Sequence, residues 1–202
     1  MKHFYHDSDY IEIKLPKKVY TKIENTVVDL FIRLKICSYP IDPFDIIRKM
    51  GYVLRKYSEL SFYERIRLRN KNLDAISCFD PDLQAFVICY DDTKFSKRIR
   101  FTLMHEVGHI LLGHKEESEL ARMMANYFAA YSLAPSPIID AYNCRDESEL
   151  ADIFVVTDEC AFYSYKRYLK WCEYGGRIKV YEEALLNMFK QSNKVEEGGN
   201  VS

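Results

Sequence analysis

Residues 101–113 read Phe-Thr-Leu-Met-His-Glu-Val-Gly-His-Ile-Leu-Leu-Gly, the most apolar helical segment of the chain. Its apolar residues and final glycine predict a buried helix that ends at Gly113. Histidines are seldom buried without a reason, so His105 and His109 in this segment need an explanation. On a helix, positions i and i+4 lie on one face, and the two imidazoles are therefore expected side by side.

The spacing of His105, Glu106 and His109 is the HExxH pattern of zinc hydrolases. Both imidazoles can bind one zinc ion, and Glu106 can take a proton from zinc-bound water as that water attacks a peptide carbonyl. The pattern arises by chance in roughly one chain per hundred of this length. Because this copy lies in an apolar helix, we predict a genuine site with zinc as its cofactor and Glu106 as the general base.

The composition is that of an ordinary globular chain, with 202 residues, 48% hydrophobic residues and a net charge of −1. It predicts one domain over residues 1–193 and a tail, 194–202, with too little apolar content to fold. The 29 basic and 30 acidic residues balance, which disfavours direct nucleic-acid binding. No segment reads as a membrane span or secretory signal, so we expect a cytoplasmic protein without a membrane partner. The scattered cysteines are expected to be reduced.

The hydrophobic patterning predicts an α+β fold, mainly helical, with a small antiparallel sheet packed beside the HExxH helix. Residues 75–79 and 85–90 are expected to form a hairpin, and residues 52–57 a third strand. Further helices are predicted at 17–36, 42–50, 117–133, 146–154, 157–171 and 180–189. Because the hairpin directly precedes the HExxH helix, an edge of this sheet is expected near the site, where it could bind an extended peptide by strand addition.

A catalytic zinc needs a third protein ligand, and the sequence offers no clear one. His114 lies nine residues after His105, which on a continuous helix is about 180° round the axis, so we expect it to point away. The short connection at 113–116 predicts that the next helix returns beside the first with position 122 level with the histidines. That position is Arg122. Glu119, one turn earlier, is the candidate substitute ligand, and Asn126, one turn later, could hydrogen-bond a ligating histidine.

The same polar residues also fit a simple solvent-exposed helix face. Apolar residues of the 117–133 helix follow one side, and Glu119, Arg122 and Asn126 fall opposite it. Glu119 and Arg122 would then form an exposed i, i+3 ion pair that contributes only a few tenths of a kcal/mol. Small residues beside this polar face, such as Ala125 and Ala129, would nevertheless allow another helix to approach closely.

The runs Arg100–His114 and Ala125–Pro135 resemble the ImmA/IrrE family of metallopeptidases, with specific similarity over residues 74–137 and further similarity at 39–57. The resemblance implies a bacterial or prophage cytosolic zincin with zinc at His105 and His109, Glu106 as general base, and a helix-turn-helix repressor as substrate. The family's expected third ligand is a glutamate that maps to position 122. Here Arg122 replaces it, and Met124 stands where a second acidic residue is common.

Two functions therefore remain open. The first is a zinc endopeptidase that cleaves or regulates a helix-turn-helix repressor, with Glu119 as the substitute ligand. The second is a pseudoprotease that binds such a partner without cutting it. A DNA-reading helix-turn-helix at 146–171 is disfavoured, because residues 157–159 place acidic side chains at the helix end that would enter the groove.

Overall fold

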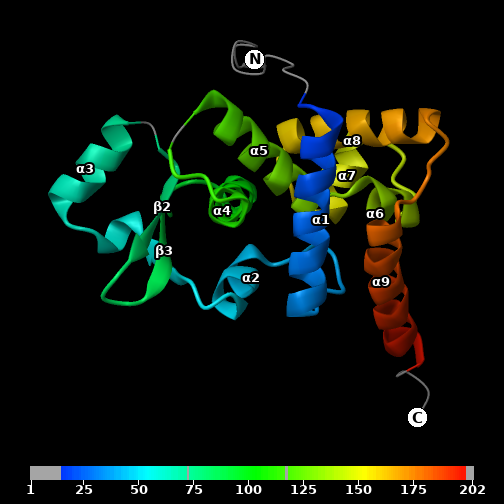
Figure 1. Cartoon of the computed structure of the whole chain (residues 1–202), viewed down its shortest axis with the longest axis horizontal. Helices are drawn as coiled ribbons and strands as arrows, with labels where there is room; N and C mark the ends of the chain where they lie inside the picture. Colours follow the sequence, from blue (N-terminus) through cyan, green and yellow to red (C-terminus); the bar gives the residue numbers. More distant parts are fainter. Residues whose placement is uncertain (1–14, 72, 117, 199–202) are drawn as a thin grey trace.

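The computed structural model describes residues 15–71, 73–116 and 118–198 (Figure 1). The first half contains α1 (Lys17–Leu34), α2 (Pro43–Lys49), β1 (Val53–Lys56), the 3-10 turn η1 (Tyr57–Glu59), α3 (Phe62–Asn70), β2 (Ala75–Asp80), β3 (Ala85–Tyr90) and α4 (Ser96–Leu112). The second half contains α5 (Glu119–Leu133), α6 (Ser136–Ala141), α7 (Glu147–Ile153), α8 (Asp158–Glu173) and α9 (Val180–Gly198). The α+β class, mainly helical with a small sheet beside α4, is confirmed.

The sheet is mixed, which differs from the wholly antiparallel sheet that we predicted. Its strand order is β1-β3-β2, with β2 and β3 forming the predicted antiparallel hairpin and β1 pairing parallel to β3. Strand β3 takes the central place because Val87 and Ile88, which point to opposite faces, are both buried. The connection between β1 and β2 contains α3, a helix that the sequence analysis missed.

Most predicted helices are confirmed, with differences near the chain ends. Helices α1, α2, α7 and α8 agree with the predicted ranges to within two residues. Helix α5 begins at Glu119, and residue 117, where we placed its start, lies outside the described residues. Helix α9 continues to Gly198, into the segment 194–202 for which we predicted no fold, and residues 199–202 are not described. In residues 15–71, 73–116 and 118–198, no helix is both long and apolar enough to cross a bilayer.

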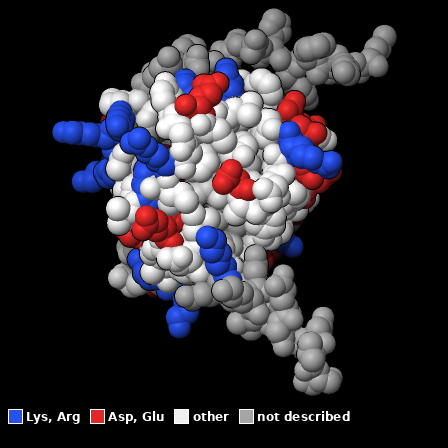
Figure 2. Space-filling model, turned by 90° about the vertical axis from the view of Figure 1, so that its right-hand side faces the viewer, with Lys and Arg blue, Asp and Glu red and all other residues white. Residues whose placement is uncertain are grey.

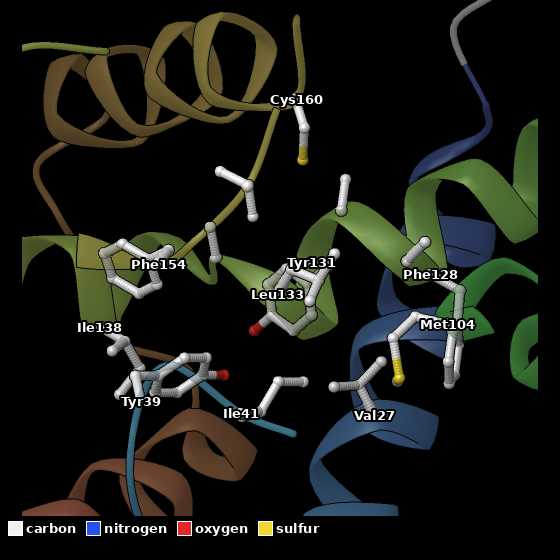
Figure 3. Packing of buried hydrophobic residues seen from close by; sticks show 14 of the residues in the cluster. Val27, Tyr39, Ile41, Met104, Phe128, Tyr131, Leu133, Ile138, Phe154 and Cys160 are labelled. Atoms are coloured by element: carbon white, nitrogen blue, oxygen red, sulfur yellow. The ribbon is translucent and has the colours of Figure 1, made fainter. Parts of the chain in front are cut away.

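A cluster of buried residues extends along the chain from Leu15 to Phe189 (Figure 3). Tyr39 lies within it, with its ring stacked on Phe189 at 4.8 Å between centroids and its hydroxyl donating to the Ser132 carbonyl oxygen at 3.0 Å. Because these contacts join α5, α9 and the segment before α2, the cluster fixes the C-terminal helices to the part of the fold that carries the HExxH helix.

Helices α4 and α5 pack closely because of a glycine in the HExxH segment. A Cβ atom placed at Gly108 would lie 3.0 Å from Cδ1 of Phe128, which is tighter than ordinary van der Waals contact. Phe128 itself is fully buried. Gly108 therefore lets α5 approach the helix that bears the histidines, and this approach brings residues of α5 to the site.

Gly108→Val is expected to lower the free energy of unfolding by about 1–3 kcal/mol, because its branched side chain would overlap the Phe128 ring. Urea denaturation of the two proteins measures the change. Phe128→Leu introduced with Gly108→Val should recover part of the loss by making room for valine. An unchanged urea midpoint in Gly108→Val would show that the helices do not pack as described.

Candidate metal centre

A cavity of about 830 Å³ opens where the sheet, α4, α5 and α8 meet. It is bordered by residues 73–77 at the start of β2, by one face of α4, by the α4–α5 connection and by the first turns of α8. His105, Glu106 and His109 all line it. The predicted placement of His105 and His109 on one face is therefore confirmed, Glu106 lines the same cavity, and the cavity is the candidate site.

The two histidines are spaced to bind one metal ion between them. Nε2 of His105 lies 3.0 Å from Nε2 of His109. Two tetrahedral zinc ligands at about 2.0–2.1 Å from the metal would lie roughly 3.4 Å apart, so the pair is within a few tenths of an ångström of that spacing. Burial, and then the neighbouring His109, lower the pKa of His105 to about 3. His105 is therefore uncharged at neutral pH, which is the form that binds metals.

Each of the two histidines has a further polar neighbour. Asn126 lines the cavity, and its side chain raises the pKa of His105 and so partly offsets the effect of burial, which fits the predicted place of Asn126 near a ligating histidine. Nδ1 of His114 lies 3.1 Å from Nδ1 of His109. Partners of this kind hold a metal-binding imidazole in one tautomer and one orientation.

The contact of His114 corrects our prediction that this residue points away. That prediction assumed a continuous helix, but α4 ends at Leu112 and Gly113 adopts a left-handed conformation with φ of 72°. The chain therefore turns back and returns His114 to the cavity. Nε2 of His114 is buried and makes no hydrogen bond within the described part of the chain.

His114→Phe is expected to weaken zinc binding at the histidine pair by about 10- to 100-fold, because His109 loses the partner that fixes its ring. Isothermal titration with zinc measures the change. His114→Gln is the matched control, since its amide oxygen can accept the same hydrogen bond from His109. Equal losses in the two variants, or none in either, would argue against this role for His114.

Glu106 is held from the sheet side of the cavity. The Ser77 hydroxyl donates to Oε2 of Glu106 at 2.6 Å, and the carboxylate is largely buried. Ser77 comes from β2, so this contact joins the edge of the sheet to the candidate general base. The sequence analysis missed Ser77, because only the tertiary pairing of β2 with α4 distinguishes it from any other serine.

Position 122 lies on the cavity side of α5, as predicted from the rise per residue along two antiparallel helices. Arg122 lines the cavity, and its charge contributes to the lowered pKa of His105. No ion pair of Arg122 is recorded within the described residues. Arg122 therefore lines the same cavity as the two imidazoles, at the position where the family resemblance implies a ligating glutamate.

Glu119, our candidate substitute ligand, is not brought together with the histidines. It is the first residue of α5, is exposed to solvent and does not line the cavity. The reason is its position three residues, or about 4.5 Å along the helix axis, before the level of the site. No group of three His, Cys, Asp or Glu side chains in the described ranges could hold a metal ion. The described residues thus fit zinc with two ligands and do not complete the site.

The first turns of α8 also border the cavity, through Thr157, Glu159, Cys160 and Tyr163. Helix α8 begins as predicted, with the Thr157 hydroxyl accepting from the Cys160 backbone N–H at 3.1 Å. Sequence reasoning gave these residues no part in the site. Packing of α8 against α5 brings them there, and no local pattern signals that packing.

Comparison with known proteins agrees with the resemblance. Residues 64–161 match the model of the peptidase M78 family, described as the IrrE N-terminal-like domain. The match runs from α3 to the start of α8 and includes the cavity residues discussed above except Tyr163, but not the similarity that we noted at 39–57. No curated protein matches the chain. Residues 64–161 therefore form an IrrE N-terminal-like domain of this metallopeptidase family.

Proposed function

We propose that this member of the peptidase M78 family binds an extended segment of a protein partner, at a metallopeptidase site that has lost its third ligand. The observation that carries the proposal is Arg122, which lines the cavity beside His105 where the family's glutamate is expected. A guanidinium cannot ligate zinc, and its charge opposes a divalent cation. Two histidines alone should bind zinc only weakly.

The peptide-binding element is the open edge of β2. In the described residues β2 pairs only with β3. The Asp91 N–H donates to the Asp74 carbonyl oxygen at 2.8 Å, so these two residues form a hydrogen-bonded pair next to the hairpin ladder. Backbone groups alternate in direction along an antiparallel strand. Ala75 and Ser77 therefore direct their N–H and C=O groups away from β3.

Ala75 and Ser77 both line the cavity. An added peptide strand could pair with their free backbone groups and so pass in front of α4. Such pairing gives affinity through the main chain, while side chains that point into the cavity give specificity. This supports binding of an extended peptide more directly than binding of a small molecule.

The family resemblance suggests the class of partner, a helix-turn-helix repressor of bacterial or prophage origin. We call the part of the cavity between the open edge of β2 and α4 the groove. We propose that binding to this groove regulates such a repressor. Direct nucleic-acid binding is not part of the proposal, because the charge of the chain is balanced. Figure 2 is consistent with this on the face that it shows, where acidic and basic side chains are interspersed.

Zinc-dependent peptide hydrolysis is the second candidate function. The 3.0 Å spacing of the two Nε2 atoms and the placement of Glu106 in the same cavity favour it. This function needs a third ligand that the described residues do not supply. Metal content and product formation separate the two candidates.

Strand addition can be tested with a ten-residue peptide selected by phage display against the full chain. Methylation of successive backbone nitrogens of this peptide should weaken binding at every second position, because only alternate N–H groups face β2. Uniform loss, or no loss, would contradict strand addition. Cleavage of the peptide by wild-type protein, abolished by His105→Ala, would instead support the second candidate.

A further inference from the structure

We infer that the groove selects peptides with an acidic side chain, whose carboxylate pairs with Arg122. This inference rests on the proposed function and adds a specificity to it. It depends on the charges that line the cavity, on which of them are already paired, and on the direction of side chains on a strand added to β2.

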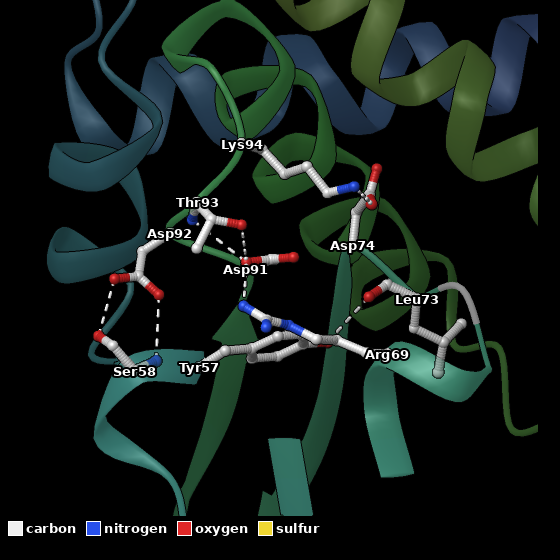
Figure 4. A network of polar contacts seen from close by, with 9 residues as sticks. All are labelled: Tyr57, Ser58, Arg69, Leu73, Asp74, Asp91, Asp92, Thr93 and Lys94. Atoms are coloured by element: carbon white, nitrogen blue, oxygen red, sulfur yellow. Dashed lines mark hydrogen bonds and ion pairs between the residues drawn. The ribbon is translucent and has the colours of Figure 1, made fainter. Parts of the chain in front are cut away.

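Four cationic side chains line the cavity, those of Lys71, Arg98, Lys115 and Arg122, and Arg98 at the sheet end is already paired. Nε of Arg98 donates to Oδ2 of Asp74 at 2.7 Å, and Nζ of Lys94 lies 3.1 Å from Oδ1 of the same carboxylate. Figure 4 shows Lys94 and Asp74 within a larger set of polar contacts beside the sheet, in which Arg69 pairs with Asp91. Arg98 thus shares its charge with the Asp74 carboxylate, which weakens its attraction for an anion of a ligand.

Arg122, in contrast, has no ion pair or side-chain hydrogen bond recorded within the described ranges. Two carboxylates in the same cavity, Glu116 and Glu159, make no ion pair with it, and Glu106 accepts from Ser77. Arg122 therefore lines the cavity without a carboxylate partner among the described residues. An arginine in this state binds a carboxylate through two parallel hydrogen bonds, which a lysine or an amide cannot reproduce.

The path of a bound peptide brings a side chain to this position. Alternate side chains of an added strand point to the same face as those of β2. Ser77 of β2 points to α4, as its contact with Glu106 shows. Every second peptide side chain therefore points into the cavity, toward α4 and Arg122 on α5. Because Glu106, Glu116 and Glu159 line the same cavity, a single negative charge suits it better than the double charge of a phosphate.

The test uses three pools of ten-residue peptides with a fixed central Glu, Gln or Lys and flanks drawn from uncharged residues. Acetylated and amidated ends leave the central side chain as the only charge. A fourth pool has a free C-terminal carboxylate and central Gln, which separates recognition of a chain end from recognition of a side chain. Fluorescence anisotropy with EDTA present measures affinity for the full chain without metal.

We expect wild-type protein to bind the Glu pool at least about tenfold more tightly than the Gln pool, as a charged hydrogen-bonded pair requires. Arg122→Glu should reverse the order, so that the Lys pool binds best. Arg33→Glu, which makes the same change of charge on the exposed surface of α1 away from the cavity, should keep the preference for Glu. Equal urea midpoints for the two variants will show that both fold.

Four outcomes would overturn the inference. Equal binding of the Glu and Gln pools would leave a peptide groove without acidic selectivity, so the proposed function would stand while the inference failed. Tightest binding of the fourth pool would assign the site to a chain terminus. Loss of the preference for Glu in Arg33→Glu as well would show that the preference comes from the net charge of the protein and not from Arg122. Failure of all pools to bind would contradict the proposed function itself.

Discussion

Arg122→Glu is expected to raise the zinc affinity of this protein by at least about 100-fold, or roughly 3 kcal/mol. The substitution replaces a cation that opposes zinc with an anionic ligand beside His105 and His109. The change should not harm the fold, because Arg122 is exposed and glutamate is favourable in the first turns of a helix. Zinc titration by calorimetry measures the gain.

The gain must depend on the histidines if the account is correct. Arg122→Glu combined with His105→Ala should bind zinc no more tightly than wild-type protein. Equal, weak binding in wild type, Arg122→Glu and the double variant would mean that position 122 does not face the site. Tight zinc binding by wild type that is lost in Glu119→Ala would show that Glu119 reaches the metal after all.

Glu106→Gln is expected to reduce any peptide hydrolysis by about 10²- to 10⁴-fold, in wild type or in Arg122→Glu. An amide cannot take the proton that the carboxylate accepts. The fold and zinc affinity should be unchanged, because Glu106 is not a ligand and the glutamine oxygen can still accept from Ser77. Product formation from a labelled peptide, followed by mass spectrometry, measures the rate.

Ser77→Ala is the control variant for the reduced hydrolysis expected in Glu106→Gln. It removes the hydrogen bond at 2.6 Å but leaves the carboxylate, so its effect on hydrolysis should be much smaller than that of Glu106→Gln. Hydrolysis at the wild-type rate in Glu106→Gln would show that the activity comes from another site or from a contaminating protease.

The local part of the site could be predicted from the sequence because helix geometry alone determines it. A spacing of four residues places His105 and His109 on one face, and the short connection after Gly113 brings position 122 to their level. Both predictions are confirmed by the residues that line the cavity. The hairpin of β2 and β3 could also be predicted, since its two strands are neighbours in sequence.

The predictions that failed concern residues whose positions depend on a break in regular secondary structure or on tertiary packing. His114 was misplaced because a left-handed Gly113 ends the helix, and helical geometry does not apply beyond that residue. The parallel pairing of β1 with β3 depends on which strand takes the buried centre of the sheet. Ser77 and the residues of α8 reach the cavity only through tertiary packing. A single sequence contains no periodic signal for these contacts.

The most direct test of the central claim is the zinc content of the native protein, purified without added metal and measured by inductively coupled plasma mass spectrometry. If Arg122 stands in place of the third ligand, wild-type protein should hold far less than one zinc ion per chain. Arg122→Glu purified in parallel should approach one zinc ion per chain. One zinc per wild-type chain that survives dialysis against a weak chelator and disappears in His105→Ala would contradict the account.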